Sequence, residues 1–222
     1  MIDLPEISTV TLMDYSNKEV QIKVFTPESL QINHEHSTQS NSFALRLSND
    51  KTGGVYVEVG SSHYKKQNHT YFLEKEFGWT GVGIEIESNF VEEYNKERSN
   101  PCILGDAITF NWDKYFEENN FPSQIDYLCI DTDGSNLRSL MNIPFSRYRF
   151  NTIVVEFRAP NMRMQNPEID VQKTMHSILN NYNYTFIGSG YGDDYWIDNT
   201  SLRLSGNQYD GLTYGFWNQK LR

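Results

Sequence analysis

The sequence predicts an α/β protein built on a mostly parallel β-sheet. Short apolar runs rich in β-branched residues recur from Val55 onward, and segments with helical spacing separate them. Turn residues such as Gly53, Gly54 and Gly78 mark the boundaries between them. Strands that alternate with helices form right-handed βαβ units, so their strands run parallel within one sheet.

The length and net charge of the sequence limit the classes of protein to which it can belong. The 222 residues suffice for one domain with a well-buried core. The net charge of −10 disfavours extended contact with nucleic-acid phosphates. The two cysteines, Cys102 and Cys129, lie in apolar runs and are expected to be buried free thiols. With no signal peptide and no apolar stretch of the ~20 residues that span a bilayer, the sequence predicts a cytoplasmic protein without a membrane span.

The expected strands follow the apolar runs in order. Residues 1–36 are treated as an N-terminal extension whose alternating residues 20–25 predict an edge strand, and residues 37–222 as the main domain. The first strand of that domain, Val-Tyr-Val-Glu-Val at 55–59, is β-branched and aromatic. The other expected strands are 81–86, 102–104, 125–130, 152–155, 184–187 and 195–197, the last of them antiparallel.

The helices are expected between these strands. Gly78 ends the helix at 71–77, and Pro144 limits the one at 136–141. The helix at 167–179 begins with Pro167, a residue favoured in the first turn. The remaining expected helices are 40–47, 89–98 and 110–119.

Ligands of parallel sheets bind beyond the carboxyl ends of the strands, and acids gather at those ends here. Gly60, two residues after Glu58, would let a ligand approach the backbone closely, although an ordinary loop glycine is the alternative. Glu87 follows the second strand and could accept the hydroxyls of a ribose, or simply begin a helix as a solvated acid. Asp106 could accept an adenine amine or stabilise a turn.

The fourth and fifth strands end in candidates for catalysis. Asp131 and Asp133 follow an apolar strand, and such a pair could act as a general base, bind a cationic ligand or hold a metal ion. A turn at Asp133 is the alternative. Glu156 ends the fifth strand at the same rim, and His63 in the first loop could accept a proton. The other histidines, His34, His36, His69 and His176, are assigned surface or structural roles.

Several separated motifs, in order, resemble the FkbM family of methyltransferases. They are the segment from Gly54 through Glu58-Val-Gly60 to Lys66, the segments 70–75 and 78–87, and Asp126-Tyr-Leu-Cys-Ile-Asp131-Thr-Asp133-Gly134 with the strand after it. The resemblance covers about residues 39–197. This chain differs from the family in having Ser62 and Tyr64 where further glycines are usual, and Asn68-His69-Thr70-Tyr71 where Ser-Asn-Thr-Tyr is usual.

The resemblance implies a class I methyltransferase (Rossmann-like) fold with a seven-stranded sheet and helices on both faces. It implies S-adenosyl-L-methionine as methyl donor and a hydroxyl acceptor on a sugar, glycan or other small metabolite. The implied contacts are Glu58, Gly60 and Ser61 for the methionine part, Glu87 with Ser88 for the ribose, Asp106 and Ala107 for the adenine, and Asp131 beside the methyl group.

Transfer of a methyl group to a hydroxyl needs alignment and a base. Asp131, Asp133, His63 and Glu156 are the candidate bases, and a divalent cation on Asp131 and Asp133 is a lower-ranked alternative because no full ligand set is visible. The competing functions are a catalytically inactive cofactor-binding scaffold, a nicotinamide-dependent oxidoreductase and a metal-dependent hydrolase. The oxidoreductase would require a GxGxxG motif, of which only Gly60 is present.

Overall fold

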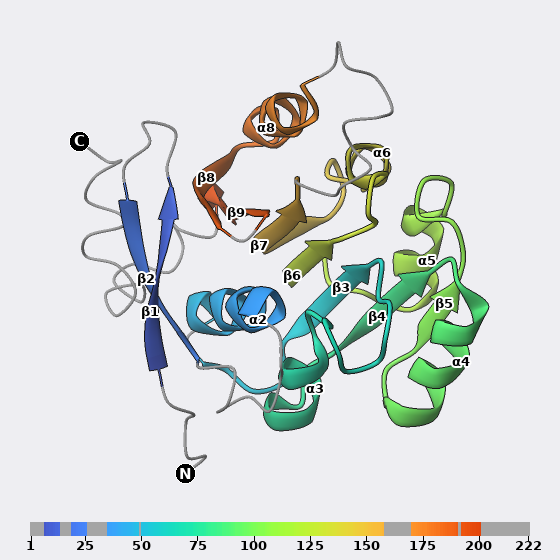
Figure 1. Cartoon of the computed structure of the whole chain (residues 1–222). Coiled ribbons are helices and arrows are strands. Elements are labelled where there is room, and N and C mark those ends of the chain that lie inside the picture. Colours follow the sequence, from blue (N-terminus) through green and yellow to red (C-terminus); the bar gives the residue numbers. More distant parts are fainter. Residues whose placement is uncertain are drawn as a thin grey trace.

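The computed structural model describes residues 7–13, 19–25, 35–48, 50–157, 170–190 and 192–200 (Figure 1). Its strands are β1 (Ile7–Met13), β2 (Glu19–Phe25), β3 (Val55–Val59), β4 (Thr80–Glu85), β5 (Cys102–Leu104), β6 (Gln124–Ile130), β7 (Arg149–Glu156), β8 (Tyr184–Gly190) and β9 (Asp193–Asp198). Its helices are α2 (Glu35–Leu47), α3 (Tyr71–Phe77), α4 (Ser88–Glu97), α5 (Trp112–Glu118), α6 (Asn136–Met141) and α8 (Val171–Asn181). Within these stretches, no helix combines the length and apolarity needed to cross a bilayer.

The described strands form one sheet in the order β2-β1-β8-β9-β7-β6-β3-β4-β5. Neighbours from β5 to β7 are parallel, whereas β9, β8, β1 and β2 continue the sheet with antiparallel pairings. The chain builds β4 and β5 on one side of β3 and then crosses over to build β6 and β7 on the other side. The order therefore reverses between β3 and β6, and a ligand crevice is expected at that point.

The predicted seven-stranded, mostly parallel sheet is confirmed by β3 to β9. Two predicted strands, at 55–59 and 102–104, coincide with β3 and β5, and the others differ by one to three residues at an end. The extension contributes the predicted edge strand as β2 and a further strand, β1, which was not predicted. Met13 of β1 pairs with Ser189 of β8, so both extra strands join the main sheet. The division of the chain at residue 36 stays a prediction.

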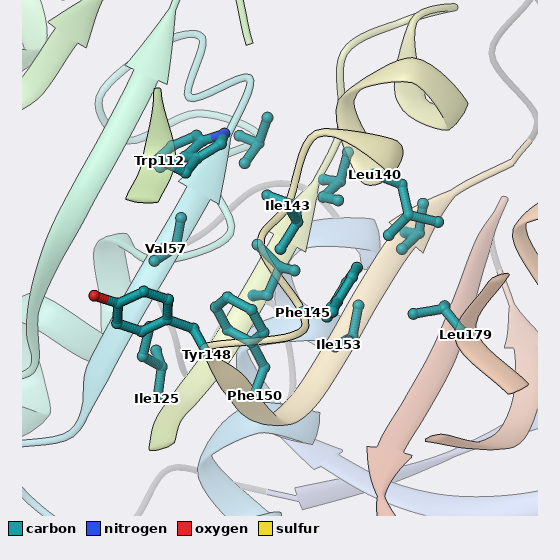
Figure 2. Close-up of a cluster of buried hydrophobic side chains, with 14 of the residues drawn as sticks. Val57, Trp112, Ile125, Leu140, Ile143, Phe145, Tyr148, Phe150, Ile153 and Leu179 are labelled. Atoms are coloured by element: carbon teal, nitrogen blue, oxygen red, sulfur yellow. The ribbon is translucent and has the colours of Figure 1, made fainter. Parts of the chain in front are cut away.

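The larger hydrophobic core lies between the sheet and helices α5, α6 and α8. Trp112, Leu140 and Leu179 come from these three helices. They belong to the same cluster of buried side chains as Val57, Ile125 and Ile153 of the strands, with Phe145, Tyr148 and Phe150 near the start of β7 (Figure 2). Val57 and Val59 of β3 and Ile153 and Val155 of β7, two residues apart in each strand, point to this face of the sheet.

The opposite face of the sheet packs against α2 and α3. Phe43 and Leu73 of these helices lie in a second cluster with Tyr127 and Tyr195 of the strands. Arg98, directly after α4, is also buried and donates through Nε to Glu74 Oε2 of α3 at 2.8 Å. This charged pair fixes the end of α4 against α3, on the side where the loop after β3 passes.

Some helices begin or end at other residues than the sequence predicts. Gly78 has φ 63° and accepts the left-handed conformation that ends α3, as predicted. α2 begins at Glu35, earlier than the predicted residue 40. α8 begins after Asp170, whose side chain accepts a hydrogen bond from Lys173 N at 3.0 Å. The helix start predicted at Pro167 lies outside the described residues.

Candidate active site

The ends of five strands meet in one row at the carboxyl edge of the sheet. Strand register aligns the residues that follow Val59, Ile84, Ile130 and Val155. This row consists of Gly60, Glu85, Asp131 and Glu156, and Asp193 of β9 pairs with Glu156. Because partners in register project to the same face of a sheet, the carboxylates of four different strands converge at this edge.

Gly60 lies at the closest approach between the loop after β3 and the end of β6. Its φ is 88°, and a Cβ atom added to it would lie 1.8 Å from the backbone oxygen of Asp131. On the other side, the backbone N–H groups of Gly60 and Ser61 both donate to Ile84 O, at 2.9 and 3.1 Å. Only glycine fits here, because both the backbone conformation and the contact exclude a side chain.

A cleft of about 270 Å³ opens beside this loop, above the ends of β3, β4, β5 and β6. The residues that line it are Gly60, Ser62, Ile84, Glu85, Ile86, Glu87, Phe90, Gly105, Asp106, Ala107, Asp131, Thr132, Asp133 and Ser135. None of these described lining residues is basic. The predicted site residues Gly60, Glu87, Asp106, Ala107, Asp131 and Asp133 are therefore brought together by the fold, and their contacts with a cofactor stay predictions.

The acid at the end of the second strand differs from the one that was predicted. The strand β4 ends at Glu85, and Glu87 is an exposed residue at the start of α4. Glu85 is only 9% exposed and accepts hydrogen bonds from the backbone N–H groups of Ser62 at 2.8 Å and Ile86 at 2.7 Å. The sequence carried a signal for Glu85, because it is the first acid after the apolar residue Ile84.

Glu58 faces the protein interior beneath the cleft. Its side chain is buried and accepts hydrogen bonds from Asn68 Nδ2, His69 N and Thr70 Oγ1, at 3.0, 2.8 and 2.9 Å. Burial raises the pKa of this carboxyl group. Glu58 therefore holds the far end of the loop 61–70 against β3, and it is not among the residues that line the cleft.

Three further candidates lie outside the cleft lining. Ser61 is 1% exposed and packs onto Gly83, where an added Cβ would lie 2.2 Å from Ser61 Oγ. Ser88 is an exposed first residue of α4. His63 stacks on Tyr64, and its Nδ1 accepts the backbone N–H groups of Lys65 and Lys66, both at 3.1 Å. Nδ1 of His63 therefore stabilises a turn through these two hydrogen bonds.

The acids that follow β6 and β7 form a compact group. One carboxylate oxygen from each of Asp131, Asp133 and Glu156 lies within 4.8 Å of the others. Burial and then the charge of Asp131 raise the pKa of Glu156 to about 8, and burial followed by the charges of Asp131 and Glu85 raises that of Asp133. The raised pKa favours the protonated form of Glu156, in which repulsion of the Asp131 carboxylate is relieved.

A histidine assigned no functional role from the sequence contacts the central acid of this group. His69 Nε2 lies 3.2 Å from Asp131 Oδ2, and His69 Nδ1 lies 2.6 Å from Ser40 Oγ of α2. The His69 side chain is 2% exposed, whereas that of Asp131 is 24% exposed and reaches the cleft. Both contacts join residues far apart in sequence, so no local pattern could have identified them.

A sequence profile described as the methyltransferase FkbM domain matches residues 16–186, more than half of the chain. The chain belongs to the FkbM methyltransferase family. The resemblance predicted from the sequence motifs is thereby confirmed. A comparison with curated proteins found no match.

The solved structures to which the chain is similar include several described as methyltransferases. A Klebsiella pneumoniae protein assigned as an O-methyltransferase has 14% identity and a TM-score of 0.50, with 77% of this chain and 86% of that chain covered. A Bacillus cereus O-methyltransferase in complex with S-adenosylhomocysteine has 16% identity and a TM-score of 0.49, covering 72% and 79%. A TehB-like methyltransferase from Corynebacterium glutamicum has 10% identity and a TM-score of 0.47, covering 74% and 86%.

The family and the sheet order together identify this FkbM protein as an S-adenosylmethionine-dependent methyltransferase with a class I fold. The divalent cation considered as an alternative from the sequence receives no support from the comparisons.

Proposed function

We propose that the protein transfers a methyl group from S-adenosylmethionine to a hydroxyl of a sugar, glycan or other small metabolite, with the cofactor bound in the cleft. The single observation that carries this proposal is the cleft itself. It follows β3, β4 and β5 beside the reversal of strand order, and its polar lining is acidic. Such a lining complements the sulfonium and ammonium charges of S-adenosylmethionine and opposes the phosphates of a dinucleotide.

The proposed cofactor contacts follow from the order of the strands. Gly60 lines the cleft, and its close backbone contact brings the loop after β3 beside Asp131, where the methionine part is proposed to lie. Glu85 replaces Glu87 as the proposed acceptor of the ribose hydroxyls, because its position is fixed by backbone donors and it lies at the strand end. Asp106 and Ala107 lie at the far end of the cleft for the adenine. Asp106 also stabilises its own turn by accepting Ile108 N at 2.9 Å.

The proposed chemistry requires little beyond alignment and a base. The bound cofactor supplies an electrophilic methyl group on a positively charged sulfur. Asp131 lies between the loop of Gly60 and Glu156, so its carboxylate can take the proton of an acceptor hydroxyl that is aligned with that methyl group. The raised pKa of Glu156 favours its protonated form, which can donate a hydrogen bond and is less suited to act as the first base.

Calorimetry with S-adenosylmethionine and S-adenosylhomocysteine tests the proposal. The expected result is one site per chain for each ligand, lost in a variant in which Glu85 and Asp106 are both replaced by alanine. Release of S-adenosylhomocysteine in the presence of methyl glycosides would then support the acceptor class. Binding of both ligands without release with any hydroxyl acceptor would favour the inactive scaffold, and absence of binding would contradict the proposal as a whole.

A further inference from the structure

We propose that His69 is a positioning residue that holds Asp131 ionised and aimed into the cleft. His69 joins three elements of the fold at this point. Its ring lies between Ser40 on α2 and Asp131 after β6, and its backbone N–H donates to Glu58 of β3. The inference deepens the proposed function, since it concerns how the proposed base is supported, and it rests on that function.

The position of the ring is fixed at both nitrogens. Nδ1 lies 2.6 Å from Ser40 Oγ and Nε2 lies 3.2 Å from Asp131 Oδ2. With 2% of its side chain exposed, the ring has no room to rotate into solvent. The loop 61–70 that carries it is itself tied down, because Glu58 accepts hydrogen bonds from three successive residues of this loop.

Chemistry then decides which nitrogen carries the proton. An ionised carboxylate can only accept hydrogen bonds, so Nε2 must carry hydrogen if it bonds to Asp131. A serine hydroxyl can donate or accept, so Ser40 can serve Nδ1 in either state of the ring. The inferred donation therefore runs from His69 Nε2–H to Asp131, while Ser40 Oγ serves as the partner of Nδ1.

This donation has a consequence for the base. Asp131 lies beside Asp133 and Glu156, and like charges at such distances favour protonation of one member of the group. An N–H group that donates to Asp131 favours its ionised form, so the proton stays on Glu156 and Asp131 remains able to accept one. During transfer, the acceptor O–H bond breaks with its proton passing to Asp131. The new O–CH₃ bond forms as the C–S electron pair returns to sulfur.

Two substitutions separate this role from simple packing. Glutamine places its amide nitrogen at the ε position, as does Nε2 of histidine, whereas asparagine reaches only the δ position. His69→Gln therefore keeps a donor toward Asp131, and His69→Asn keeps the Ser40 contact but loses that donor. Both retain the backbone bond to Glu58.

The activity experiment uses the full chain with S-adenosylmethionine and methyl glycosides, and follows release of S-adenosylhomocysteine. His69→Asn is expected to lower kcat by about ten- to a hundredfold while calorimetric affinity for S-adenosylhomocysteine is unchanged. His69→Gln is expected to retain most of the wild-type kcat. Equal losses in the two variants, or a normal kcat in His69→Asn, would overturn the inference.

A spectroscopic experiment needs no acceptor. In a two-bond ¹H–¹⁵N spectrum of the histidine-labelled wild-type chain, the His69 signals are identified by their absence from His69→Gln. The expected result is a proton on Nε2 whose resonance shifts in Asp131→Asn. A bare Nε2 with the proton only on Nδ1 would overturn the inference even if methyl transfer is observed. Failure of the wild type to bind S-adenosylmethionine would instead refute the proposed function.

Discussion

Replacing Gly60 by alanine tests whether the close approach of β3 to β6 builds the cleft. The new Cβ would lie 1.8 Å from Asp131 O, whereas real Cβ contacts are essentially never shorter than 3.0 Å. The two backbones would therefore have to separate by more than an ångström. They resist this because Asp131 N donates to Val59 O at 2.8 Å and Gly60 N donates to Ile84 O at 2.9 Å.

The expected loss in the free energy of unfolding of Gly60→Ala has two parts. A left-handed backbone costs a non-glycine residue about 1–2 kcal/mol, and overpacking of a tight contact adds about 1–3 kcal/mol. The sum of about 2–5 kcal/mol corresponds to a Tm roughly 4–20 °C lower for a domain of this size. Displacement of the loop would also misplace the methionine end of the proposed site, so affinity for S-adenosylhomocysteine should fall at least about tenfold.

Gly53→Ala is the matched control, because Gly53 has φ 69° but no atom within 4 Å of an added Cβ. It isolates the backbone strain, and it should lower the Tm by only about 2–8 °C without affecting cofactor binding. Thermal unfolding and calorimetry of both variants provide the measurement. A Gly60→Ala protein that loses no more stability than Gly53→Ala and binds S-adenosylhomocysteine normally would refute the reasoning.

Three other predictions follow from the same edge of the sheet. Glu85→Gln should weaken S-adenosylhomocysteine binding by about 1.5–3 kcal/mol in calorimetry. A larger loss of affinity in Glu87→Gln would show that Glu87, and not Glu85, binds the ribose. Asp131→Asn should lower kcat far more than cofactor affinity, and the reverse pattern would make Asp131 a cofactor anchor. Burial raises the pKa of Glu156 to about 8 in the folded state, above its ordinary value of 4.5. Its contribution to stability is therefore fully present below about pH 4.5 and is lost as the pH rises toward 8. Between pH 5 and 8 the Tm of the wild type should fall relative to that of Glu156→Gln, and parallel profiles would contradict the assignment.

The sheet was predictable because its strands alternate or are continuously apolar within sharp boundaries. The run 55–59 is bounded by Gly54 and Gly60, and it coincides with β3. β1 was not predicted, and residues 7–13 gain a partner only when β2 and β8 are in place. Pairing over long sequence distances supplies information that the segment itself does not contain.

The site was predictable in its location and less so in its individual side chains. The rule that ligands lie beyond strand ends drew attention to Gly60, Asp106 and Asp131, and these three residues line one cleft. Glu87 was favoured over Glu85 because the strand was predicted to end at residue 86, whereas β4 ends at Glu85. This shift of one residue changes which acid lies at the strand end. The contact of Glu58 with the cofactor stays a prediction, and in the structure its buried side chain accepts hydrogen bonds from the loop 61–70.

The most direct test of the account is a crystal structure with S-adenosylhomocysteine bound. We expect the ribose hydroxyls within hydrogen-bond distance of Glu85, the adenine beside Asp106 and Ala107, and the sulfur next to the loop of Gly60 with Asp131 facing it. A ligand bound with its adenine at Asp131, or bound elsewhere on the protein, would contradict the proposed site and the role given to Asp131.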